Sequence, residues 1–191
     1  MTDVFDVLRK DHEEVKQMLS QLESGPSKAR GATDSQLEQR KKLAEQLVIE
    51  ESRHEAVEQM YFWPTVRERL SGGDTLADQA IAQEQEGKEV LDKLDKLDAS
   101  DGEFEKLLTE FIKAGREHIQ FEETQVWPTL RTQLSAQDAA ELGSKLETAK
   151  KTAPTRPHPK TPPSPGALKA TGPVAGMADK ARDAMSDRGK E

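Results

Sequence analysis

The sequence contains no cysteine, which excludes disulfide bonds, cysteine-ligated zinc and iron–sulfur clusters. Aromatic residues make up only 4% of the chain, whereas strand-rich cores are enriched in aromatic and β-branched side chains. No apolar run approaches the about 20 residues that a membrane-spanning helix requires, so we expect no membrane partner. Residues 1–6, MTDVFD, lack the apolar stretch of a secretory signal. Together with the absence of cysteine, this predicts a cytoplasmic protein.

Charge is abundant but unevenly distributed. Asp, Glu, Lys and Arg account for 34% of the residues and give a net charge of −8. The negative charge lies in residues 1–150, whereas residues 151–191 are net basic and contain most of the prolines. An acidic body argues against nucleic acid as a partner. A short basic, proline-rich segment is typical of a disordered tail.

Apolar residues recur at helical spacing in five segments, which are residues 3–22, 35–70, 75–97, 103–134 and 136–150. Short connections favour antiparallel neighbours. We therefore predict an all-α fold, with an antiparallel up-down-up-down four-helix bundle and a short fifth helix in residues 1–150 and a disordered C-terminal tail in residues 151–191. Pro64 and Pro128 should kink the second and fourth helices, because proline lacks a backbone donor and crowds the preceding turn.

One sequence pattern occurs twice. Residues 54–64 read HEAVEQMYFWP, and residues 118–128 read HIQFEETQVWP. Each copy has a His at its first position, a Glu four residues later and Trp-Pro at its end. A His and a Glu at this spacing lie on one face of a helix, about 6 Å apart along the axis. Two such helices that face each other offer two imidazoles and two carboxylates to a shared pair of metal ions.

The repeat extends to the helix that precedes each copy. When His12 is aligned with Glu84, residues 14–22 match residues 86–94 at several positions. The chain is therefore two helix pairs, each with one inward donor on its first helix and two on its second. Imidazole and carboxylate groups suit iron, manganese or zinc, and buried carboxylates at one level of a core require cations. The predicted metal ligands are His12, His54, Glu58, Glu84, His118 and Glu122.

This pattern resembles the hemerythrin family, in its HHE cation-binding branch. The resemblance covers about residues 1–150 and is most specific in the two His-x-x-x-Glu helices. It implies a non-haem centre of two iron ions, with manganese possible, joined by an oxo or hydroxo bridge. It also implies that Glu58 and Glu122 bridge the ions, and that the centre binds or reacts with a small molecule such as O₂, NO or H₂O₂.

The sequence departs from the family pattern in the third helix, which carries Glu84 where the family usually has His. The additional histidine ligands of O₂-carrying hemerythrins are also absent, because the only other histidine is His158 in the tail. A site with three imidazoles and three carboxylates is hard and anionic, which favours ferric iron. We therefore expect catalase-like peroxide disproportionation, or O₂ or NO sensing and scavenging in redox defence, rather than reversible O₂ carriage.

Three further polar residues lie near the predicted ligands. Tyr61 follows Glu58 by three residues and shares its face, so it is the candidate catalytic residue, as a ligand, a hydrogen-bond donor or a relay; a half-buried core tyrosine is the alternative. The repeat gives Gln125 the equivalent position. Glu51 precedes His54 by three residues and either orients its imidazole or lies exposed on the helix surface.

Two other functions remain open. A ferritin-like iron-handling protein would need Glu-x-x-His on each of two helices; residues 51–54 fit this motif, but residues 115–118, GREH, do not. A metal-stabilised interaction module would use its tail, in which residues 162–165, PPSP, are a weak recognition signal for partners.

Overall fold

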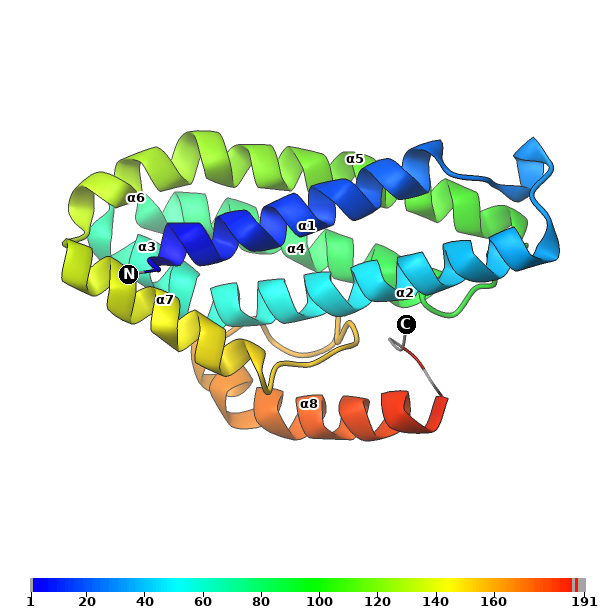
Figure 1. Ribbon diagram of the computed structural model, residues 1–191. Helices are drawn as coiled ribbons and strands as arrows, with labels where there is room; N and C mark the ends of the chain where they lie inside the picture. Colours follow the sequence, from blue (N-terminus) through cyan, green and yellow to red (C-terminus); the bar gives the residue numbers. More distant parts are fainter. Residues whose placement is uncertain (1, 187, 189–191) are drawn as a thin grey trace.

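The computed structural model describes residues 2–186 and 188, and all regular secondary structure in this part of the chain is helical (Figure 1). The elements are α1 (Val4–Ser24), the 3-10 helix η1 (Lys28–Arg30), α2 (Asp34–Val57), η2 (Glu58–Phe62), α3 (Trp63–Arg69), α4 (Gly73–Leu94), α5 (Gly102–Phe121), η3 (Glu122–Val126), α6 (Trp127–Gln133), α7 (Ala136–Lys150) and α8 (Pro165–Ser186). The prediction of an all-α bundle with a short fifth helix is confirmed, because α2, η2 and α3 form one continuous arm, and α5, η3 and α6 form another.

Local sequence signals define where the helices begin. A capping box starts α1, where the side chains of Asp3 and Asp6 each accept a hydrogen bond from the other residue's backbone N–H. Thr33 and Gln36 form the same motif at the start of α2. The connections between successive long helices are short, and these helices run antiparallel (Figure 1). In the bundle, α1 packs against α2 and α5, and α4 packs against α5 and α2.

The two long arms change their hydrogen-bond register just before their prolines. The elements η2 and η3 are π-helical turns, in which the backbone N–H groups of Trp63 and Trp127 donate to the carbonyls of Glu58 and Glu122, five residues earlier. Pro64 and Pro128 have no backbone N–H, so neither can donate the α-helical hydrogen bond to the carbonyl four residues earlier. The disturbance expected at each proline therefore takes the form of a π-turn, a feature frequent at functional sites.

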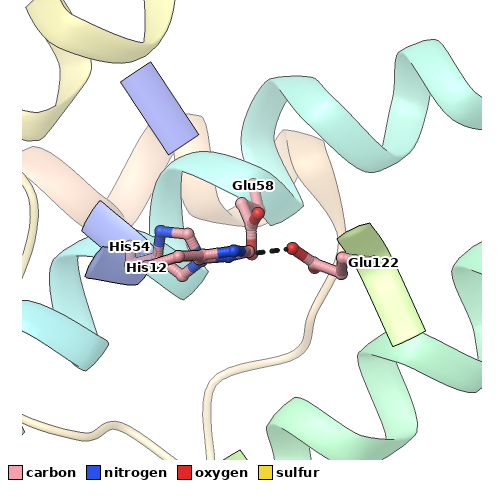
Figure 2. Close-up of side chains that lie close together, drawn as sticks. All are labelled: His12, His54, Glu58 and Glu122. Atoms are coloured by element: carbon pink, nitrogen blue, oxygen red, sulfur yellow. Dashed lines mark ion pairs between the residues drawn. The ribbon is translucent and has the colours of Figure 1, made fainter. Parts of the chain in front are cut away.

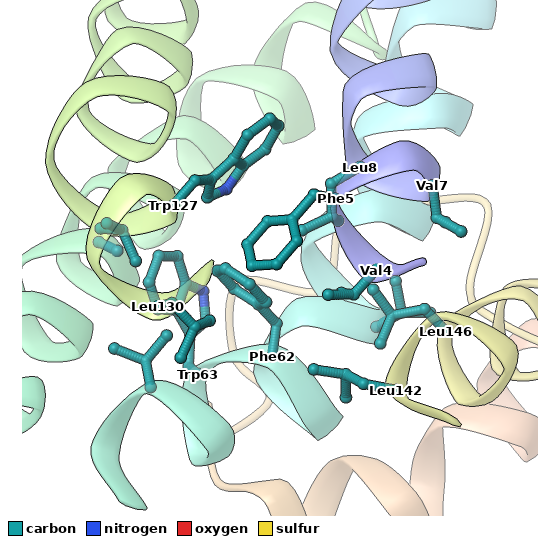
Figure 3. Close-up of a cluster of buried hydrophobic side chains, with 14 of the residues drawn as sticks. Val4, Phe5, Val7, Leu8, Phe62, Trp63, Trp127, Leu130, Leu142 and Leu146 are labelled. Atoms are coloured by element: carbon teal, nitrogen blue, oxygen red, sulfur yellow. The ribbon is translucent and has the colours of Figure 1, made fainter. Parts of the chain in front are cut away.

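Two apolar clusters fill the bundle. One connects the start of α1 with η2, α3, η3, α6 and α7, and includes Phe62 and Trp63, neither of which is exposed (Figure 3). The other connects the opposite ends of α1, α2, α4 and α5. Along α1, the first cluster ends at Leu8 and the second begins at Val15. His12 lies between these two residues, so a buried polar layer separates the clusters.

The segment whose composition predicts a disordered tail contains a helix. Helix α8 packs against η2 and lies outside the bundle, alongside α2 (Figure 1). Its acidic residues pair with the preceding loop: Asp179 with His158 at 2.9 Å, and Asp183 with Arg156 at 2.7 Å. These pairs order the segment although its apolar content is low. None of the helices in residues 2–186 and 188 is long and apolar enough to cross a membrane. The domain boundary predicted at residue 150 stays a prediction.

A glycine allows α7 to cross α1 closely. A Cβ atom on Gly143 would lie 2.8 Å from the carbonyl carbon of Asp3 and 2.9 Å from the backbone nitrogen of Val4. We expect Gly143→Ala to lower the free energy of unfolding by about 1–3 kcal/mol, because the helices must separate. Denaturant unfolding measures this loss. Gly102→Ala is the control, because a Cβ atom added at Gly102 would extend into open space; equal stabilities of the two variants would contradict the close packing.

Candidate metal centre

Six side chains meet in the polar layer between the two apolar clusters. They come from all four long arms of the bundle, and each arm that carries the repeat supplies a His from its α-helix and the Glu that opens its π-turn. The residues are His12 of α1, His54 of α2, Glu58 of η2, Glu84 of α4, His118 of α5 and Glu122 of η3. The structure therefore brings together all six residues that the sequence singles out as donors.

The donors form two groups that share Glu58 and Glu122. The groups are His12, His54, Glu58 and Glu122, drawn in Figure 2, and Glu58, Glu84, His118 and Glu122. Within each group, one ligand atom from each residue lies within 4.8 Å of the others. The two shared carboxylates are therefore placed to contact two adjacent cations, one in each group.

The imidazoles present their Nε2 atoms to these carboxylates. His12 Nε2 lies 3.2 Å from Glu122 Oε2, His54 Nε2 lies 3.2 Å from Glu58 Oε2, and His118 Nε2 lies 3.2 Å from Glu122 Oε1. These three nitrogens and all four oxygens of Glu58 and Glu122 are buried without a hydrogen-bond partner among residues 2–186 and 188. Buried polar atoms are normally satisfied, so a cluster of unsatisfied ligand atoms fits a metal site.

Each imidazole is held from behind through its Nδ1 atom. His54 Nδ1 lies 3.4 Å from Asp11 Oδ2, and the Nδ1 atoms of His12 and His118 each lie 3.0 Å from an oxygen. For His12 this oxygen belongs to Glu123, and for His118 to Gln83. A carboxylate or amide oxygen can only accept, so in the neutral imidazole Nδ1 carries the proton and the Nε2 lone pair faces the site.

The charges of the site depend on one another. Burial raises the pKa of Glu58 well above its ordinary value, and the charges of Glu122 and Glu84 raise it further. Burial would also raise the pKa of Glu122, but the imidazoles of His118 and His12 lower it instead. Burial opposes protonation of His118, yet Glu122 and other carboxylates raise its pKa to about 9. Protons on Glu58, His12 and His118, whose pKa values are all raised, thus compensate for negative charge that bound cations would neutralise.

The two tryptophans of the repeat have different contacts. Trp63 donates its indole N–H to Glu84, whose other oxygen accepts from the side-chain amide of Gln59. Trp127 instead stacks on the ring of His12, with centroids 4.8 Å apart and planes at 17°. The sequence predicts a packing role for both indoles. Both are buried, but Trp63 also donates a hydrogen bond that the sequence did not predict.

The residues behind the donors were not evident from the sequence, although each one adjoins a predicted donor in the chain. Asp11 precedes His12, Gln83 precedes the donor of α4, and Glu123 follows the donor of η3. Each holds a donor on another element rather than its chain neighbour. Glu51, one candidate for orienting His54, is buried rather than exposed, and burial raises its pKa to about 7; Asp11 makes the contact with His54.

Tyr61 lies at the side of the bundle that α8 covers. Its ring is half-buried and lies beneath the ammonium group of Lys169, which is 4.5 Å from the ring centroid. It lines a pocket of about 420 Å³ between η2, α7 and α8. Gln125, its equivalent in the repeat, is exposed. The two positions are therefore not equivalent in space, and a catalytic role for Tyr61 stays a prediction.

Comparisons with known proteins agree with this geometry. The sequence matches the family model of the hemerythrin HHE cation-binding domain over residues 3–130, a range that includes all six donors. An uncharacterized hemerythrin-like protein of Schizosaccharomyces pombe is 30% identical over 186 residues, which cover 97% of this chain and 87% of that protein.

A solved structure shares the fold. It is that of a hemerythrin HHE cation-binding domain-containing protein of Mycobacterium kansasii, a homologue of Rv2633c. The TM-score is 0.63 at 21% sequence identity, and the match covers 79% of this chain and 86% of that chain. The family model and the Schizosaccharomyces pombe relative establish what the repeated His-x-x-x-Glu motif indicates: the chain belongs to the hemerythrin family and is a metal-binding protein of its HHE cation-binding branch.

Proposed function

We propose that this protein binds two iron ions through the six donors and reacts with peroxide, NO or O₂ in redox defence or sensing. The observation that carries the proposal is the cluster of buried ligand atoms without hydrogen-bond partners, which belong to three imidazoles and two shared glutamates. Imidazole and carboxylate donors suit iron, with manganese as the nearest alternative. The location of these atoms between two apolar clusters keeps them out of water.

The two donor groups support one ion in each. His12 and His54 would hold one ion, Glu84 and His118 would hold the other, and Glu58 and Glu122 would contact both. When bound, two adjacent iron ions would supply the redox chemistry that a small oxidant requires. The protein supplies the positions of the donors, their protonation and the exclusion of water.

Four contacts perform these roles. Asp11, Gln83 and Glu123 keep each imidazole in the tautomer whose Nε2 lone pair faces the site. The indole of Trp127 stacks on His12 and limits the access of water from that side. A site buried between two apolar clusters suits a small neutral molecule better than a large or charged substrate.

The donor set favours redox turnover over reversible carriage of O₂. Glu84 adds a third carboxylate where the family usually has His, and carboxylate oxygens are harder ligands than imidazole nitrogens. A harder, more anionic environment stabilises the ferric state, whereas an O₂ carrier must keep its ferrous state available. Peroxide disproportionation or NO scavenging is therefore the activity that we expect.

Loading the purified protein with iron under anaerobic conditions tests the proposal. We expect two iron ions per chain, a charge-transfer absorbance of paired ferric ions after oxidation, and a spectral response to peroxide, NO or O₂. Manganese loading gives the same stoichiometry with a different spectrum. The proposal is falsified if the loaded protein shows neither the ferric-pair absorbance nor any response to the three small molecules.

The iron content per chain also distinguishes this proposal from a ferritin-like iron-handling protein. Storage of iron would give a content far above two ions per chain that rises with the iron supplied. The bundle has one polar layer with two donor groups among residues 2–186 and 188, so we expect the content to saturate at two. A content that continues to rise would favour storage.

A further inference from the structure

The contacts behind the six donors follow the internal repeat. The residue before the first donor of each half holds the histidine of that half's second helix: Asp11 holds His54, and Gln83 holds His118. A second type of contact joins the two halves, which are the two helix pairs of the repeat. In each half, the residue after the shared glutamate contacts the first donor of the other half: Gln59 contacts Glu84, and Glu123 contacts His12.

These last two contacts differ in a way that matches their donors. His12 offers an N–H from Nδ1, and its partner Glu123 is a carboxylate, which can only accept. Glu84 is a carboxylate that needs donors, and its partner Gln59 supplies an amide N–H. The repeat therefore differs at two aligned positions at once, His12 against Glu84 and Glu123 against Gln59, and the two differences compensate.

We propose that Gln59 and Glu123 are positioning residues that determine which type of donor each metal position receives. Gln59 allows a carboxylate at position 84, which a carboxylate at position 59 would exclude, and Glu123 specifies an imidazole at position 12. The departure of this chain from the usual family pattern at position 84 is thus one half of a coupled pair. This inference rests on the proposed metal-binding function and extends it to the residues that make the two metal positions chemically different.

The surroundings explain why a mismatch is costly at position 59. Glu58, Gln59 and Glu84 are at most 2% exposed, so a carboxylate at position 59 would face that of Glu84 without water to screen the repulsion. Glu123 is in a different situation, because Lys16 lies 2.6 Å from its Oε1 atom and neutralises it. The side chain at position 59 is therefore the stricter of the two.

The indoles show that an imidazole is compatible with position 84. With His at this position, Trp63 would lose the acceptor for its N–H. The equivalent Trp127 already has a buried Nε1 atom without a partner among residues 2–186 and 188, beside an imidazole donor. A buried indole N–H without a partner beside an imidazole, as Glu84→His would create at Trp63, therefore already occurs at Trp127.

A cycle of three variants tests the coupling, with anaerobic titration of Fe²⁺ as the measurement. We expect Gln59→Glu to weaken binding at the second metal position about 10–100-fold, the range for residues that orient ligands. Glu84→His should lose less, because the Gln59 amide can turn its oxygen toward an imidazole, as Gln83 does for His118. The double variant Gln59→Glu, Glu84→His should recover at least about tenfold over Gln59→Glu alone. An equally weak double variant, or an unaffected Gln59→Glu, would overturn the proposal.

The same cycle in the metal-free protein separates this proposal from the proposed function. Urea unfolding gives a coupling free energy between positions 59 and 84, and we expect the double variant to be more stable than the sum of the single changes predicts. If the unaltered chain bound no iron but the coupling persisted, the pairing would stand and the proposed function would fall. Iron binding without any coupling would leave the proposed function standing and remove the role of Gln59.

Discussion

His118→Ala is expected to lose most of the bound metal and to unfold more easily. The change removes the imidazole whose Nε2 atom lies 3.2 Å from Glu122 Oε1, in a position where Glu122 has no exposed surface. Removing one member of a buried charged pair costs about 3–5 kcal/mol, because the remaining charge stays buried without its partner. Metal analysis of the purified variant measures the first effect, and denaturant unfolding of the metal-free protein measures the second.

His158→Ala is the matched control, because it removes the one histidine outside the site. His158 pairs with Asp179 of α8 rather than with any donor. We expect the control to keep the metal content of the unaltered chain, and to change at most the attachment of α8. If both variants bound equal amounts of metal, His118 would not be a ligand and the second donor group would be incorrect.

The six candidate donors could be predicted from the sequence, because four of them are fixed by local helix geometry and the other two by the internal repeat. The spacing of four residues between His54 and Glu58 puts both on one helix face, and the repeat transfers the same relation to the second arm. His12 and Glu84 then follow from aligning the preceding helices. Short connections and the helical spacing of apolar residues predict the antiparallel bundle for the same reason: the information lies within a few turns of one helix.

The contacts behind the donors could not be predicted, because they join elements that are distant in the chain. Asp11 and His54 are separated by 43 residues, and His12 and Glu123 by 111. No helical periodicity relates such pairs, and they become visible only when the helices are packed. The repeat did contain one clue. At one pair of aligned positions it has Gln59 and Glu123, and at another it has Glu84 and His12, so the amide occurs with the carboxylate donor and the carboxylate with the imidazole donor.

Two other features were beyond the reach of composition. Pro64 predicts a break in the α-helical hydrogen bonds, but it does not specify that the preceding turn widens into a π-helix that starts at a donor. Helix α8 buries Leu168 in an apolar cluster and is also held by paired polar groups, such as Asp183 with Arg156. These contacts join distant parts of the chain, so the rules that identify disorder from composition do not detect them.

The two tryptophans of the repeat provide a second large and internally controlled prediction. Trp63→Phe should cost about 1–3 kcal/mol more than Trp127→Phe, which is the range for removing a hydrogen-bond partner from a buried polar group. Both changes remove an indole N–H from a buried position of the same motif. In Trp63 that N–H donates to Glu84, whereas in Trp127 it has no partner among residues 2–186 and 188.

The metal affinities should separate in the same direction. Trp63→Phe leaves Gln59 as the remaining side-chain donor to Glu84, so the second metal position should weaken about 10–100-fold. Phenylalanine at position 127 keeps a ring to stack on His12, and we expect nearly unchanged binding there. Urea unfolding of the metal-free variants and titration with Fe²⁺ measure both differences. Equal losses in the two variants would mean that the indoles act only through packing, and that Glu84 is held in place without the hydrogen bond from Trp63.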